Sequence, residues 1–150
     1  NQFERKYITM GKEVKTNAMR ILDKNKIPYE IINYECDEFI DGLHTAEATG
    51  APVEQSFKTL VMQGKSKQYY VFVLPIAEEV DLKVAAITGY VRGGCTPLGM
   101  KKQFPTVLHD SARNFDKIYI SGGRIGTSIT VNPDALLSVV RGQYADIIMH

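Results

Sequence analysis

The sequence predicts a single mixed α/β domain of the α+β kind, with a mixed, mainly antiparallel sheet or barrel flanked by helices. Three observations support this fold class. Strand-like runs with alternating apolar residues recur along the chain. Two pairs of these runs enclose short glycine-containing turns and so predict hairpins. Helical patterns lie near both ends, and the 150 residues, 44% hydrophobic, suffice for one compact core.

The elements of the first third begin with a helix. Apolar residues recur at helical spacing from Val14 to Leu22, and Thr16 is a candidate cap. A strand is expected over 27–34 and a short helix over 45–49, capped by Thr45. Residues 1–9 lack apolar periodicity and are expected to be a variable leader or an artificially added segment outside the fold, so that the single domain spans 10–150.

The remaining elements are two hairpins and a closing helix. Residues 56–62 and 68–74 alternate around a turn, and residues 117–120 and 127–131 do the same around the loop 121–126. After the second hairpin, Asn132 and Pro133 supply a cap and a favoured first helical residue, which predicts a helix from there.

A glycine-rich run over 88–102 is the most informative stretch for function. It holds four glycines, one proline and the three cations Arg92, Lys101 and Lys102. Glycines let backbone groups approach a ligand closely, and the cations suggest an anionic one, so we expect a loop that presents its backbone. A turn with solvated charges is the plainer alternative. A second such loop, 121–126 with Arg124, favours a shared pocket.

Lys58 lies among residues expected in the core, with Phe57 and Leu60 on opposite sides of a strand. At a sheet edge this cation would discourage aggregation. In a cleft its ammonium would bind a phosphate or polarise a carbonyl.

The cysteines and histidines predict no metal site and no cofactor. Cys36 and Cys95 are too far apart in sequence for a metal or redox motif. For Cys95 we favour a small packing residue over a nucleophile, because no histidine is near it in sequence to act as its base. His44 and His109 are expected to be surface or capping residues.

The motifs around Phe57 to Leu60, Gly89 to Gly99 and Tyr119 to Gly123 occur in the order and spacing of one family. The chain resembles the YbaK proteins, relatives of the editing domain of bacterial prolyl-tRNA synthetases, over nearly all of 16–148. The resemblance implies an aminoacyl-tRNA deacylase that clears cysteine from proline tRNA, and also from cysteine tRNA as a further substrate. A deacylase for alanine or serine, or a non-catalytic tRNA- or synthetase-binding regulator, remains an alternative.

The resemblance also assigns site residues. It implies that Lys58 is essential, together with Gly93 and Pro97 of a G-x-x-x-P loop. The implied substrate pocket contains Tyr34, Phe57, Thr59, Gly94, Cys95, Thr96, Ser121, Gly122, Gly123 and Ser128. Contacts to tRNA are expected from Arg92, Lys101, Lys102 and Arg124, although Ile125 departs from a basic pair common in the family.

The implied chemistry uses no nucleophile of the protein. In the family the substrate's own thiol is thought to attack its ester carbonyl, which releases the amino acid as a thiolactone, while Lys58 anchors the phosphate or carbonyl region. Compared with the family, the chain is short near 83–86, which we interpret as a flexible segment absent from the sequence rather than a deletion.

Charge and hydropathy set the expected partners and location. A net charge of +1 and a pI near 7.9 give no global attraction to nucleic acid, so tRNA contact must come from local patches. Selectivity would then depend on a partner, for which prolyl-tRNA synthetase is the candidate. No membrane-spanning run or signal peptide is present, and we expect a soluble cytoplasmic protein without a membrane partner.

Overall fold

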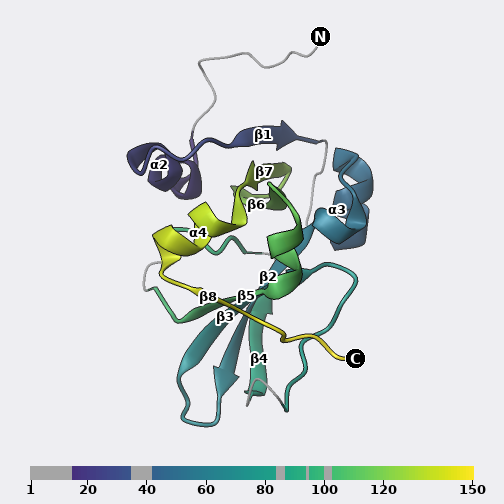
Figure 1. The fold of residues 1–150 in the computed structure, drawn as a ribbon, viewed down its shortest axis with the longest axis vertical. Helices are drawn as coiled ribbons and strands as arrows, with labels where there is room; N and C mark the ends of the chain where they lie inside the picture. The colour runs from purple at the N-terminus through teal and green to yellow at the C-terminus, as the bar shows by residue number, and fades with distance from the viewer. Residues whose placement is uncertain (1–14, 35–41, 84–86, 94, 100–102) are drawn as a thin grey trace.

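The computed structural model describes residues 15–34, 42–83, 87–93, 95–99 and 103–150. Figure 1 shows two sheets with helices packed around them. The expected leader over 1–9 and the shortened junction at 84–86 lie outside the described residues. Within the described part of the chain, no helix is long and apolar enough to cross a membrane.

The smaller sheet has three antiparallel strands in the order β1 (Glu30–Asn33), β7 (Thr127–Val131) and β6 (Ile118–Arg124). The predicted hairpin of β6 and β7 is confirmed, but the strand expected over 117–120 continues to Arg124, with a register shift between Ser121 and Arg124, so most of the predicted loop 121–126 belongs to β6. The strand predicted over 27–34 is confirmed but shorter, because only four residues pair with β7.

The larger sheet has five strands in the order β4 (Ile87–Gly93), β2 (Phe57–Gly64), β3 (Tyr69–Pro75), β5 (Thr106–His109) and β8 (Gln143–Ala145). The predicted β2–β3 hairpin is confirmed. Strand β5 pairs in parallel with both β3 and β8, so the sheet is mixed. Mixed α/β architecture with a largely antiparallel pairing pattern agrees with the predicted fold class.

One expectation about the glycine-rich run is wrong. Residues up to Gly93 are not loop but form strand β4, which pairs with β2. The ladder contains two register shifts, one beside Val61 and one beside Gln63. Glycines tolerate such bulges, so a run rich in glycine can still complete a sheet.

Among the residues that the structure describes, three α-helices accompany the sheets. Helix α2 (Asn17–Lys24) is capped by Thr16, and helix α4 (Pro133–Val140) is capped by Asn132, as predicted. Helix α3 (Gly42–Thr49) starts one turn earlier than predicted. Thr45 therefore lies inside the helix and is not its cap, because a threonine can occupy a helix interior as well as a cap position. Two short 3₁₀ helices complete the fold, η1 (Val53–Gln55) and η2 (Asp110–Asn114).

The main core lies between the two sheets and takes in the apolar faces of α2 and α4. Met19 and Leu22 of α2 and Leu136 of α4 are almost fully buried there. A smaller apolar cluster lies on the other face of the larger sheet, where Met62, Phe72 and Leu74 pack against Ile147 of the C-terminal segment. The C-terminal segment is held over this face by the bridge between Val80 and Ile148.

The two sheets meet at the start of β2. Ser56 forms a parallel bridge with Tyr119 of β6, and the Gln55 side chain donates to the carbonyl of Lys117 at 3.1 Å. In Figure 1 the start of β2 lies below the smaller sheet, and the rest of the strand belongs to the larger one. The residues that follow Ser56 are therefore placed next to both sheets.

Candidate active site

Lys58 is the second residue of β2 and is half-buried. It pairs with Leu74 on β3, whereas the pairing of β2 with β4 starts two residues later, opposite Gly93. On its other side, the bridge from Ser56 connects this end of β2 to β6. Lys58 is thus not on a free sheet edge, and the explanation of this lysine as an edge residue is wrong.

Strand pairing places several predicted residues on one face, which we call the site face. Bridge partners point to the same side, and side chains alternate along a strand, so Lys58 shares a side with Tyr119 and Ser121. Ser121 pairs with Ser128, which pairs with Ile32 on β1. The site face therefore carries Lys58, Tyr119, Ser121, Ser128 and Ile32.

Tyr34 extends this row at the end of β1. Its amide donates to the carbonyl of Gly126 at 2.9 Å, which continues the pairing of β1 with β7 by one residue. Because side chains alternate, Tyr34 follows Ile32 on the site face. A side chain at Gly126 would meet the Tyr34 carbonyl at 3.1 Å, so the hairpin turn and Tyr34 are in close contact.

The loop after β4 lies beside Lys58. The Cys95 thiol is 3.7 Å from the carbonyl oxygen of Thr59, in contact distance for a weak hydrogen bond. Pro97 and Leu98 are buried, and the Thr96 hydroxyl accepts from the Leu98 amide at 3.4 Å. Gly93, which pairs with Leu60, and Cys95 therefore lie against the same short part of β2 that carries Lys58.

The second glycine loop is fixed from outside the hairpin. The Thr16 hydroxyl, at the start of α2, donates to the carbonyl of Gly122 at 2.6 Å. The Ser121 hydroxyl accepts from the Gly123 amide at 3.2 Å. Gly122 has no room for a side chain, because an added Cβ would lie 2.8 Å from the methyl group of Thr127.

Other predicted residues lie away from the site face. Phe57 and Thr59 point into the main core and are almost completely buried. Arg124 pairs with Thr127 at the hairpin end and donates to its hydroxyl at 3.0 Å, on the opposite side from Ser121. For Arg92 only the backbone is described, and Gly94, Lys101 and Lys102 lie outside the described residues.

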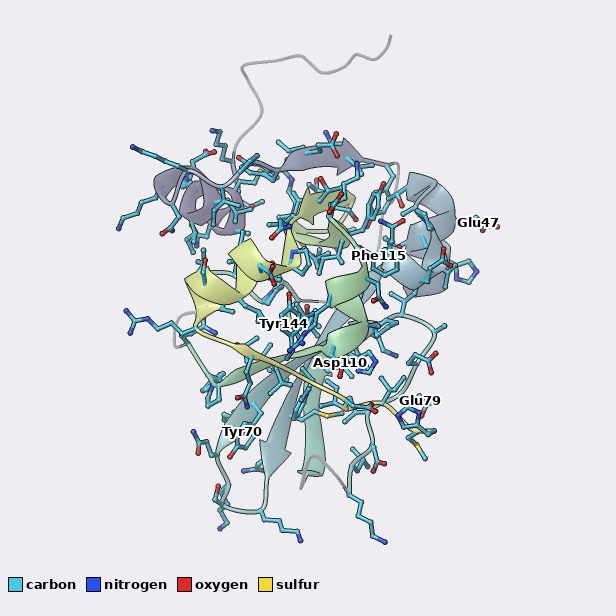
Figure 2. The ribbon with its side chains drawn as sticks, in the orientation of Figure 1. Glu47, Tyr70, Glu79, Asp110, Phe115 and Tyr144 are labelled. Atoms are coloured by element: carbon cyan, nitrogen blue, oxygen red, sulfur yellow. The ribbon has the colours of Figure 1, made fainter. Side chains whose placement is uncertain are left out.

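The electrostatic surroundings of Lys58 include two residues that the sequence did not single out. Burial lowers the pKa of the Lys58 ammonium, and the carboxylates of Glu79 and then Glu78 oppose this shift. Figure 2 shows Glu79 next to the C-terminal segment, and the Met149 amide donates to its carbonyl at 2.8 Å. The charged form of Lys58 thus loses part of its hydration, and the two acidic neighbours offset part of that cost.

Two smaller sequence expectations concern Cys95 and His109. Cys95 packs against the main core, as a small packing residue would. His109 is buried rather than on the surface, and its ring accepts from the Ile147 amide at 3.4 Å. The expectation for His109 was wrong because strand β5, which buries it, was not predicted.

Comparison with known proteins places this site in a family. The chain is 38% identical to a protein of Enterococcus faecalis assigned as a Cys-tRNA(Pro)/Cys-tRNA(Cys) deacylase, EbsC, over 89% of this chain and 93% of that protein. The chain belongs to the YbaK family of Cys-tRNA deacylases. No family model matches the sequence. The predicted resemblance is therefore confirmed by a relative that matches nearly the whole chain.

Solved structures show the same YbaK-type fold. A protein assigned as a trans-editing enzyme for prolyl-tRNA synthetase superposes with a TM-score of 0.74 at 20% identity, over 92% of this chain and all of that one. The hypothetical protein APE2540 superposes with a TM-score of 0.78 at 15% identity, over 89% of this chain and all of that one. At these identities the matches establish the fold alone.

Proposed function

We propose that this member of the YbaK family removes cysteine from mischarged proline tRNA, and also accepts cysteine tRNA, acting on the acceptor end of the aminoacylated tRNA in the cytoplasm. One observation carries the proposal. The residues around Lys58 on β2 adjoin strand β6, which runs into the second glycine-rich segment, through the bridge between Ser56 and Tyr119, and they adjoin the loop after β4 through the contact of Cys95 with Thr59. A cation beside two backbone-presenting loops suits an anionic, ester-linked substrate.

In this proposal Lys58 supplies positive charge and the loops supply backbone donors. The ammonium of Lys58 binds the terminal phosphate or the ester carbonyl, and the amides between Gly93 and Pro97 hold the aminoacyl group. Tyr34, Ser121 and Ser128 line the site face beside it. Phe57 and Thr59 act from the core side by fixing the position of β2.

The nucleophile comes from the substrate. The cysteinyl thiol attacks its own ester carbonyl, the new sulfur–carbon bond forms, and the bond from that carbon to the ribose oxygen breaks. The thiol proton goes to the departing ribose hydroxyl, and cysteine leaves as a thiolactone that water then opens. The protein contributes positioning and charge stabilisation rather than a covalent intermediate.

Single-turnover deacylation tests this scheme. We expect fast loss of cysteine from proline tRNA and much slower loss of alanine, because alanine has no thiol. Lys58→Met keeps a side chain of similar length without its charge, and should abolish turnover while leaving the fold intact by circular dichroism. Equal rates for alanine and cysteine would reject the thiol step, and no turnover of either would favour a binding module.

A synthetase partner follows from the small recognition surface. A domain of this size without an anticodon-reading module gains tRNA selectivity when it is held on prolyl-tRNA synthetase. Binding of the two proteins should strengthen when proline tRNA is added, which sedimentation of the mixture measures. If the two proteins sediment separately both with and without proline tRNA, this partner is rejected.

A further inference from the structure

A shallow hollow of about 300 Å³ lies along helix α2 beside the loop residue Gly99. Its lining consists of Asn17, Arg20, Ile21, Lys24 and Gly99. The four helix residues are spaced at three- and four-residue intervals, so they form one stripe of α2. Figure 1 places α2 at the periphery beside β1, and Figure 2 shows long side chains of this helix pointing away from the protein.

The stripe is positively charged without compensation inside the helix. Arg20 and Lys24 are four residues apart, and two like charges at this spacing disfavour a helix. Lys24 in the last turn is favoured by the helix dipole, but Arg20 in the middle has no such benefit. Among the described residues, neither cation forms an ion pair with a carboxylate.

The acidic residue of the helix is already engaged elsewhere. Asp23 is bound by the ammonium of Lys15, and it also accepts from the Tyr29 hydroxyl at 3.0 Å. Arg20 instead donates to the Asn17 side chain at 3.2 Å, an arrangement that orients its guanidinium without neutralising it. The hollow thus presents an oriented arginine and a lysine to the solvent, which suits the oxygens of a phosphate.

Helix α2 connects this hollow to both glycine loops. Its cap residue Thr16 donates to the carbonyl of Gly122. At the other loop, an added side chain on Gly99 would lie 3.0 Å from the Cβ of Asn17, so that glycine packs directly on the helix. Both glycine segments therefore adjoin the start of α2, the helix that carries Arg20 and Lys24.

We propose that the hollow on α2 binds backbone phosphates of an RNA whose acceptor end occupies the site face. This inference rests on the proposed function and adds a second contact surface to it. Arg20 and Lys24 bind phosphate, Asn17 positions Arg20, and the contact is independent of the base sequence. The surface holds the acceptor stem while the site face holds the aminoacyl end.

Binding of uncharged proline tRNA, followed by fluorescence anisotropy at several salt concentrations, tests the surface without requiring catalysis. The variant Arg20→Ala/Lys24→Ala removes both cations, and alanine preserves the exposed helix. The control Lys65→Ala/Lys83→Ala removes two exposed lysines on other parts of the chain. Both variants lose the same net charge.

We expect the α2 variant alone to lower the slope of log affinity against log salt, by about 2 for two phosphate contacts. When the salt is raised from 50 to 200 mM, the wild type and the variant both lose affinity. The factor by which the wild type loses affinity should be roughly ten times the factor for the variant. Equal slopes for wild type and variant would overturn the proposal, as would an equal decrease in the control.

A comparison of substrates separates this inference from the proposed function. The α2 variant should deacylate full-length cysteinyl-tRNA with a KM raised about tenfold, as expected from the lost phosphate contacts. Its rate on cysteine esterified to adenosine alone, which is too short to reach α2, should match the wild type. A wild type inactive on both substrates would reject the proposed activity, while the salt slopes would still decide the RNA surface. An equal loss on both substrates would overturn the surface.

Discussion

Replacing Thr16 by valine removes a hydroxyl with two hydrogen bonds and keeps the shape of the side chain. The hydroxyl accepts from the Met19 amide at 3.2 Å as the cap of α2, and donates to the Gly122 carbonyl at 2.6 Å. Loss of a cap costs about 1 kcal/mol, and loss of a partly buried hydrogen bond about as much. We therefore expect the free energy of unfolding to fall by about 2 kcal/mol, and Tm by about 4–8 °C for a chain of this size.

Urea unfolding measures this change, because a shift in midpoint at constant slope reports stability alone. Thr16→Ser is the matched control, since it keeps the hydroxyl and loses only a methyl group. We expect the serine variant to retain most of the stability. The reasoning is refuted if serine costs as much as valine, or if valine costs less than about 0.5 kcal/mol.

Three further predictions concern the site and its surroundings. Burial lowers the pKa of Lys58, so the unfolded chain binds this proton more tightly than the folded chain does. The free energy of unfolding of the wild type should therefore rise with pH between that lowered pKa and 10.5. Urea titrations at successive pH values measure this rise, and Lys58→Met should remove it. Gly99→Ala and Gly50→Ala both place alanine at a φ near +75°, but only an alanine at position 99 also meets Asn17. The free energy of unfolding should therefore fall by about 1 kcal/mol more for Gly99→Ala than for Gly50→Ala, as measured by thermal unfolding. Equal losses would contradict the contact with Asn17. Cys95→Ala should deacylate cysteinyl-tRNA within about threefold of the wild-type rate, since the substrate supplies the nucleophile, and a loss of about a hundredfold in single-turnover assays would instead indicate a protein nucleophile.

The sequence predicted the parts of the fold in which local signals and tertiary structure agree. Alternating β-branched and aromatic residues around glycine turns identified both hairpins, and Asn132 with Pro133 marked the start of α4. Strands β5 and β8 escaped prediction because they are short and pair in parallel with residues far away in sequence. Strand β4 escaped because its bulged ladder tolerates the glycines that suggested a loop.

For the site, motifs identified the residues but not their surroundings. Lys58 and Ser121 were both selected, yet only the bridge between Ser56 and Tyr119 shows that they share a face. The proximity of Glu79 to Lys58 depends on the turn after β3, which brings an exposed acidic residue back to the start of β2. No local pattern encodes such a relation, because it arises from the packing of separate segments.

The junction of the two sheets also bears on how the site forms during folding. The hydrogen bond from Gln55 to Lys117 links residues 62 positions apart, so closing this loop costs conformational entropy before the contacts repay it. The β2–β3 hairpin, with its short turn, is local and forms readily by comparison. Lys58 would then be positioned on an early hairpin, while Ser121 and Ser128 would join it only when the smaller sheet docks. Opening of that junction alone would separate the residues of the site while the hairpin itself remains folded.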